Sequence, residues 1–265
     1  MSPTPYQNAD ADRLHDEAAD IETPQTAQTP PAVSAPLPSP SASQAEPDMA
    51  PPVRVVLVRH GVTDFTHQGR LDGRGGADPA LNDAGLAQAR AAARGVQDLL
   101  GDGAGVRVVS SSLHRARQTA QAIAGAFDLQ PEVENDLDEL CFGEWDGRRV
   151  ADISRESGEA LQRSRSEEDV PPPGGESYAQ LAERVLAAFA RLVDETREMA
   201  TDDASATLVV VTHRGPIGCI LADVLGMPLP TVWRIATHPC SLTAMQFWRD
   251  GGVVVEFVND TSHLR

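Results

Sequence analysis

Two histidines and several arginines directly follow short apolar segments of the chain. Arg59 and His60 follow the segment 53–58, Arg115 comes a few residues after 106–109, and His213 and Arg214 follow 207–211. Guanidinium groups match the oxygens of a phosphoryl group with a rigid fork of donors and stay charged. A neutral imidazole is a good nucleophile toward phosphorus. If the three segments end at the same edge of one sheet, these side chains form a pocket suited to phosphoryl chemistry.

The elements that must position these residues follow from the hydrophobic pattern. The three apolar segments are rich in β-branched residues and lack clean alternation, which is typical of strands covered on both faces. Helical spacing predicts four helices and their caps: one after Asn82 to residue 100, one over 113–127, one after the Ser177–Gln180 capping pair to residue 192, and one over 217–225. Polar residues 148–176 predict a loop, and 241–247 with 253–258 predict a hairpin.

The alternation of strands and helices predicts an α/β fold. We expect a three-layer α/β/α sandwich with a mainly parallel central sheet over residues 53–265. In such sheets ligands bind beyond the carboxyl ends of the strands, where the histidines and arginines lie. Residues 1–52 hold 11 of the 20 prolines and few large apolar side chains, so we expect them to form a disordered, Pro/Ala-rich acidic tail.

The charge and the basic residues exclude several function classes. The formal net charge is −17, of which the eight acids and one arginine of residues 1–52 account for −7. A net-acidic domain gains nothing from a polyanion, so no nucleic-acid partner is expected. All 22 basic residues are arginine. The absence of lysine excludes a P-loop, a pyridoxal phosphate enzyme and a protein kinase.

The cysteines and the hydropathy predict the compartment. Cys141, Cys219 and Cys240 are far apart and form no CxxC pair, which favours a reducing environment. The chain has no apolar signal segment at its start and no run of about 18 apolar residues. We therefore expect a cytoplasmic protein that does not associate with membranes.

Six motifs occur in one order along residues 53–265. They are LVRHGVT (57–63), LNDAGLAQA (81–89), SSSLHRARQTA (110–120), LDELCFGEWDG (137–147), PGGES (173–177) and VTHRG (211–215). This series resembles the histidine phosphatase superfamily, the phosphoglycerate mutase-like proteins. The chain departs from the family pattern at Asn82, where threonine is usual, and at Arg214, where glycine is usual. The sequence VNDTSHL (258–264) is similar to the ending of actinobacterial α-ribazole phosphatase-like domains.

The resemblance implies a role for each matching residue. His60 is the nucleophile, and Glu139 protonates the departing alkoxide and then deprotonates the attacking water. Arg59, Arg115 and His213 bind the phosphoryl group and stabilise its transition state. The pocket cations replace a metal ion, so no metal and no other cofactor is expected.

Further residues are expected around the substrate. Gly61 would let the backbone approach the site closely. Thr63 and Thr66 are candidate donors to phosphate oxygens, and Arg70 is a candidate for the substrate side. Arg214 is expected at the substrate edge or on the surface rather than against the phosphate.

Neighbouring residues compete for some of these roles. Asp138 and Glu144 are the alternatives to Glu139 if the motif is displaced. Arg117 lies two residues after Arg115, and on a helix the two diverge by about 200°, so only one can face the pocket. His60 and His213 could also be structural core histidines, a reading that the surrounding motifs disfavour.

The predicted reaction is hydrolysis of a small phosphorylated metabolite, in the manner of a histidine acid phosphatase-type phosphomonoesterase. Residues 148–176 are expected to cover the pocket and set the preference, and the resemblance suggests α-ribazole phosphate or a sugar phosphate. One alternative is phosphoryl transfer of the phosphoglycerate mutase type. Family mutases carry a glutamate where this chain has Val62, and a lysine-containing region that it lacks. Another is a non-catalytic module that binds a phosphorylated ligand.

Overall fold

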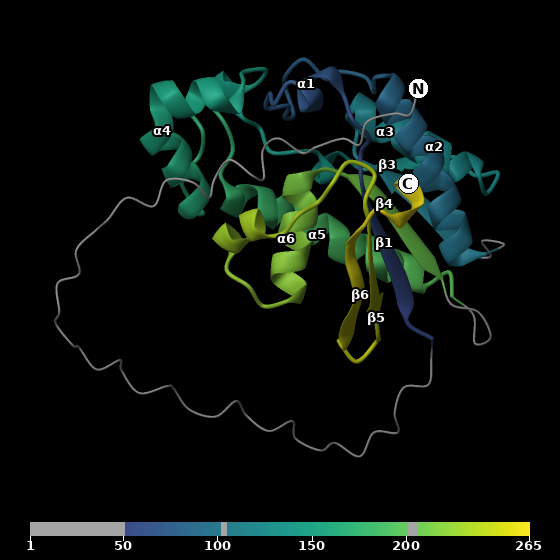
Figure 1. Ribbon diagram of the computed structural model, residues 1–265. Coiled ribbons are helices and arrows are strands. Elements are labelled where there is room, and N and C mark those ends of the chain that lie inside the picture. The colour runs from purple at the N-terminus through teal and green to yellow at the C-terminus, as the bar shows by residue number, and fades with distance from the viewer. Residues whose placement is uncertain (1–50, 102–104, 201–205) are drawn as a thin grey trace, which may run out of the picture. The chain divides into compact units, whose positions relative to one another are not determined.

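The computed structural model describes residues 51–265 except 102–104 and 201–205 (Figure 1). The predicted tail, apart from its last two residues, lies outside the described residues and stays a prediction. The strands are β1 (Val53–Arg59), β2 (Val106–Ser110), β3 (Glu132–Val133), β4 (Thr207–Thr212), β5 (Leu242–Phe247) and β6 (Val253–Asp260). The α-helices are α1 (Asp64–His67), α2 (Asp83–Leu100), α3 (His114–Gly125), α4 (Val150–Ser166), α5 (Tyr178–Arg197) and α6 (Arg214–Val224). Short 3₁₀ helices are η2 (Asn135–Leu137), η3 (Gly143–Trp145), η4 (Leu229–Arg234) and η5 (Ser262–Leu264).

The six strands form one sheet in the order β3-β2-β4-β1-β5-β6. The pairs β2–β3, β2–β4 and β1–β4 are parallel, whereas β1–β5 and β5–β6 are antiparallel. The predicted mainly parallel sheet and the C-terminal hairpin are therefore confirmed. Helices α2 and α3 lie against one face of the sheet, and α5 and α6 against the other (Figure 1).

Strand β1 shows why the sheet is covered on both faces. Its side chains alternate between two cores: Val53, Val55 and Leu57 pack with α5 and α6, while Val56 and Val58 pack with α2 and α3. All five are fully buried. Because successive side chains of a strand point to opposite faces and both faces are covered, Val55 to Val58 are apolar without a break.

The predicted helix starts are confirmed by their caps. The Asn82 side chain accepts a hydrogen bond from the amide of Gly85 at 3.0 Å, and α2 begins at the next residue. Ser177 and Gln180 form the reciprocal capping box that begins α5. Each cap satisfies amides that have no partner inside their helix.

The prediction of a loop over residues 148–176 was wrong in its first half. Helix α4 spans Val150–Ser166, with a kink at Ser157. Only Ile153, Leu161 and Ser164 of this helix are buried, and the two apolar residues join Trp145 in a small cluster apart from the main cores. Helix α4 covers this outlying cluster rather than the sheet, so it needs few apolar residues. The polar sequence of α4 therefore shows no helical spacing of apolar positions.

The register of the parallel strands brings their carboxyl ends together. Arg59 at the end of β1 pairs with Thr212 at the end of β4, and Ser110 at the end of β2 pairs with Val211. The residues that follow these three strands therefore start from one edge of the sheet. Within the part of the chain that the structure describes, no helix has the length and apolarity needed to cross a membrane.

Candidate active site

His60 lies at the centre of this edge with one ring nitrogen fixed by the backbone. Its Nδ1 is 2.8 Å from the carbonyl oxygen of Gly61, so Nδ1 carries the proton and donates it there. This leaves the lone pair of Nε2 free for nucleophilic attack. Burial lowers the pKa of His60 well below its usual value, and the nearby Arg115 and Arg59 lower it further. The imidazole is thus held neutral and nucleophilic.

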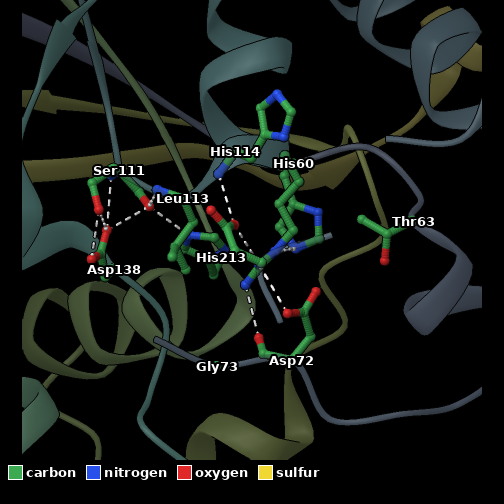
Figure 2. A network of polar contacts seen from close by, with 12 residues as sticks. His60, Thr63, Asp72, Gly73, Ser111, Leu113, His114, Asp138 and His213 are labelled. Atoms are coloured by element: carbon green, nitrogen blue, oxygen red, sulfur yellow. Dashed lines mark hydrogen bonds and ion pairs between the residues drawn. The ribbon is translucent and has the colours of Figure 1, made fainter. Parts of the chain in front are cut away.

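The second histidine is oriented by a hydroxyl and a carboxylate (Figure 2). The centroids of the His60 and His213 rings are 5.0 Å apart. His213 Nε2 lies 2.7 Å from Ser111 Oγ, which donates its own proton to Asp138 Oδ1 at 2.8 Å. Ser111 Oγ must therefore accept a proton from His213 Nε2. The other nitrogen, Nδ1, is buried and has no partner among the described residues, so it can face a ligand.

Asp138 and Ser111 are functional residues whose roles the sequence did not reveal. Asp138 had been considered only as an alternative to Glu139, but it accepts hydrogen bonds from the Ser111 hydroxyl and from the amide and hydroxyl of Ser112. It therefore acts through His213 as a positioning residue. The serine-rich run 110–112 was the available signal.

Arg115 lies beside His60 and is fully buried. Its Nε donates toward His60 Nε2 at 3.3 Å, so the guanidinium lies directly beside the nitrogen on which a phosphoryl group would form. Its two terminal nitrogens are held by Asp72, one by the carboxylate at 3.1 Å and the other by the carbonyl oxygen at 2.8 Å. Asp72 thus competes with an incoming phosphate for the same guanidinium.

Asp72 was absent from the sequence predictions, and its ionisation has consequences for binding. Burial raises the pKa of Asp72 to about 7, although Arg115 opposes this rise; Asp146, Asp78 and Glu139 reinforce it. Its Oδ2 is buried without a partner among the described residues. Below pH 7 the carboxyl is neutral and releases Arg115 from charge pairing, whereas above pH 7 the carboxylate holds Arg115 and repels a phosphate dianion.

We expect Asp72→Asn to change the pH dependence of substrate affinity. In the unaltered protein the KM for a phosphomonoester should rise as the pH increases through about 7, because Asp72 ionises. In the variant this rise should be absent, with a KM at pH 8 lower by about 5-fold, equivalent to about 1 kcal/mol. Steady-state kinetics from pH 6.5 to 8.5 test this, since the substrate is mainly dianionic in both enzymes there. Superimposable KM profiles would contradict it.

Glu139 is held by backbone amides at the rim of the same edge. It is 8% exposed, and its two carboxylate oxygens accept hydrogen bonds from the amides of Leu140 at 2.8 Å and Gly215 at 3.2 Å. Arg184 of α5 supports its loop by donating to the carbonyl oxygens of Asp136, Asp138 and Glu139, and it also pairs with Glu176 at 2.7 Å. Glu144, the other alternative acid, is exposed. Of the three acids in this motif, Asp138 is bound by Ser111 and Ser112 and Glu144 is exposed, so Glu139 is the candidate acid.

Gly215 is required by the position of Glu139. A Cβ atom at residue 215 would lie 2.3 Å from Glu139 Oε1. We therefore expect Gly215→Ala to displace the carboxylate and lower kcat by about 10-fold, a fraction of the effect of a general acid. KM should change little, because the phosphate ligands are not touched. Kinetics together with a thermal unfolding curve test this, and an unchanged kcat in a folded variant would contradict it.

Two further arginines predicted at the site, Arg59 and Arg70, have different contacts. Arg59 donates to the carbonyl oxygen of Thr237 at 2.6 Å, and its Nε is buried without a partner in the described chain. Burial, then Arg214, lower the pKa of Arg59 to about 10, so it remains charged at neutral pH. Arg70 stacks on Phe65 at 5.1 Å from the ring centroid. These cations are available to an anion, and their contact with substrate stays a prediction.

Gly61 packs against the start of helix α2. A Cβ at residue 61 would lie 2.7 Å from the carbonyl oxygen of Gly85, so this contact requires glycine, and the expected approach of the Gly61 backbone to the substrate stays a prediction. The Gly61 amide donates a hydrogen bond to the hydroxyl oxygen of Thr119 at 3.1 Å. Thr63 and Thr66 bind each other in the capping box of α1, and Thr63 lies apart from the contacts drawn around His60 (Figure 2).

Among the described residues, no group of three or more histidine, cysteine or acidic side chains could hold a metal ion. The charged groups around His60 are instead arginines, with Asp72 and Glu139 at their edge. This arrangement can bind a phosphoryl group, present a neutral imidazole to it and deliver a proton from a carboxyl group.

Comparisons with known proteins show which sequences and folds the chain is similar to. The bifunctional protein Rv2228c of Mycobacterium tuberculosis is 33% identical over 97% of this chain and 68% of its own length. A probable phosphoglycerate mutase, GpmB of Salmonella paratyphi C, is 29% identical over 80% of this chain and 95% of its own. The structure of mycobacterial glucosyl-3-phosphoglycerate phosphatase Rv2419c superimposes with a TM-score of 0.68, 29% identity, and coverage of 79% of this chain and 100% of that one. The family model of the histidine phosphatase superfamily, branch 1, matches residues 55–261, and the chain belongs to this family.

Proposed function

We propose that the chain is a phosphomonoesterase that hydrolyses a small phosphorylated metabolite through a phosphohistidine on His60. The observation that carries this proposal is the hydrogen bond from His60 Nδ1 to the carbonyl of Gly61, which leaves Nε2 unprotonated 3.3 Å from the Nε of the buried Arg115. A nucleophilic nitrogen and a buried cation therefore lie directly beside each other, so a phosphoryl group that reaches Nε2 also meets the guanidinium.

The reaction has two steps in this arrangement. His60 Nε2 attacks phosphorus, the P–O bond to the alcohol breaks, and Glu139 gives its proton to the departing oxygen. Glu139 then takes a proton from water, which attacks phosphorus and releases His60 and inorganic phosphate. Arg59 and Arg115 stabilise the charge on the phosphoryl oxygens. Burial, then Arg115, lower the pKa of His213, and the ring, which Ser111 orients through Nε2, donates from Nδ1 to a phosphoryl oxygen only when it takes up a second proton.

The comparisons support hydrolysis without identifying the alcohol. Relatives include a glucosyl-3-phosphoglycerate phosphatase and a probable phosphoglycerate mutase by name. A sugar phosphate or α-ribazole phosphate fits the proposal. Phosphoglycerate mutase-type transfer is the second candidate, favoured by the match to GpmB and disfavoured by Val62 and the lack of lysine.

The test is turnover of p-nitrophenyl phosphate with and without EDTA, together with isolation of the phosphoenzyme. We expect equal rates with and without the chelator and an acid-labile, base-stable phosphate on the protein. Phosphoglycerate interconversion much faster than hydrolysis would instead establish the mutase. Loss of activity on chelation would contradict the metal-independent mechanism.

A further inference from the structure

Two arginines stack on one tryptophan next to the candidate active site. Arg165 lies near the end of α4, Arg214 begins α6, and Trp233 belongs to η4. The two guanidinium carbons are 4.6 and 4.9 Å from the centroid of the Trp233 ring. Tyr178, the first residue of α5, packs edge-on against the same ring with centroids 5.6 Å apart. Four separate elements therefore bring two cations and two aromatic rings together.

Neither guanidinium has an acidic partner in the described part of the chain. Arg163, two residues before Arg165 on the same helix, forms an ion pair with Glu167 at 2.9 Å, and Arg184, Arg191 and Arg197 on α5 are also paired. Two like charges on one ring repel each other. An anion bound by both guanidinium groups would remove this repulsion.

Hydrogen-bond donors without partners accompany the two cations. Trp233 Nε1 is buried and unpartnered among the described residues. Burial raises the pKa of Tyr178 well above its usual value, so its hydroxyl stays protonated. Tyr178, Trp233 and Arg165 also line a small, largely apolar hollow with Leu140 and Phe142; it has room for about one water molecule, and Arg214 does not line it. The place thus offers positive charge, donors and an apolar wall, which are the features of a site for an organic anion.

The two arginines continue the positive charge of the phosphoryl pocket. Arg214 follows His213 directly, and its charge contributes to the lowered pKa of Arg59. Arg214 and burial likewise lower the pKa of Arg165. A substrate whose phosphate is at His60 would therefore extend past Arg214 toward Arg165.

We propose that Arg165 and Arg214 bind a second anionic group of the substrate, a carboxylate or a second phosphate that is not hydrolysed, while Trp233 packs against the carbon skeleton between the two groups. This proposal rests on the proposed function, because it concerns the alcohol part of the phosphomonoester. It narrows the substrate class from phosphomonoesters in general to those with at least two anionic groups.

Matched substrates that differ in one charge provide the test. The first pair is 4-carboxyphenyl phosphate and 4-carbamoylphenyl phosphate, and the second is butane-1,4-diol bisphosphate and its monophosphate. For each pair we expect a ratio of kcat/KM, charged over neutral, on the order of 10-fold in the unaltered protein, the scale of a charge-assisted hydrogen bond. The pair with the larger ratio shows whether the group is a carboxylate or a phosphate.

The variants Arg165→Gln and Arg214→Gln should bring this ratio close to one, while Arg165→Lys should retain part of it. Arg163→Gln is the matched control, since it removes one charge from the exposed side of the same helix and should leave the ratio unchanged. A ratio of one for both pairs in the unaltered protein would overturn the proposal, as would a full ratio in Arg165→Gln.

Affinity measurements with phosphonates that cannot be hydrolysed test the second anion site independently of the proposed hydrolytic activity. The affinities of 4-carboxybenzylphosphonate and its amide, measured by calorimetry on the same proteins, require no turnover. A preference for the carboxylate that Arg165→Gln removes would support the second anion site even if no substrate were hydrolysed. Equal affinities in the unaltered protein would refute the site, whatever the hydrolytic activity.

Discussion

Replacing His60 with alanine should abolish turnover, with a loss on the order of 10⁴-fold or more in kcat. The physical reason is that the unprotonated Nε2 of His60 is the atom on which the phosphoenzyme forms, and the other imidazole cannot take its place. His213 donates from Nε2 to Ser111, and its ring centroid is 5.0 Å from that of His60. A quench experiment with ³²P-labelled substrate should therefore find no acid-labile phosphate on the variant.

The matched control for this experiment is His114→Ala. His114 begins helix α3 one residue before Arg115, and its side chain is exposed. This control should keep both the turnover and the phosphoenzyme. Labelled protein in His60→Ala, or comparable losses in the two variants, would show that the nucleophile is a different group.

Glu139→Gln should slow the release of an alkyl alcohol by about 10²-fold or more, the scale of general acid catalysis. An alkoxide needs a proton to leave, whereas p-nitrophenolate leaves without one. The loss in the first step should therefore be much smaller for p-nitrophenyl phosphate than for an alkyl phosphate. Because the variant also lacks the base for the second step, the phosphoenzyme should accumulate during turnover of p-nitrophenyl phosphate, giving a burst of nitrophenolate.

Two further variants separate the acid from its neighbours. Glu144→Gln alters an exposed carboxylate five residues along the same motif and should have no effect on either substrate. Asp138→Asn should lower the activity on alkyl and aryl phosphates equally, because Asp138 acts through Ser111 and His213. A leaving-group dependence in Asp138→Asn, and none in Glu139→Gln, would reverse the assignment.

Most of the fold was predictable because its signals are local. A strand with an unbroken apolar run, such as 55–58, must be covered on both faces, and the caps at Asn82 and Ser177 place the starts of α2 and α5. Helix α4 could not be predicted in this way. Its few buried residues face a small cluster around Trp145 that exists only once distant segments have packed together.

The sequence by itself determined the family, the order of the main strands and helices except α4, and the candidate nucleophile, acid and phosphate ligands, because these residues occupy fixed places in the motifs. Only the tertiary structure showed which other side chains contact these candidate residues. Asp72 contacts Arg115 across 43 positions, Arg184 supports Glu139 across 45, and Arg165 and Arg214 meet on Trp233. Such contacts depend on how separate elements pack, and a single sequence has no local pattern that reports the burial and the neighbours of a charged side chain.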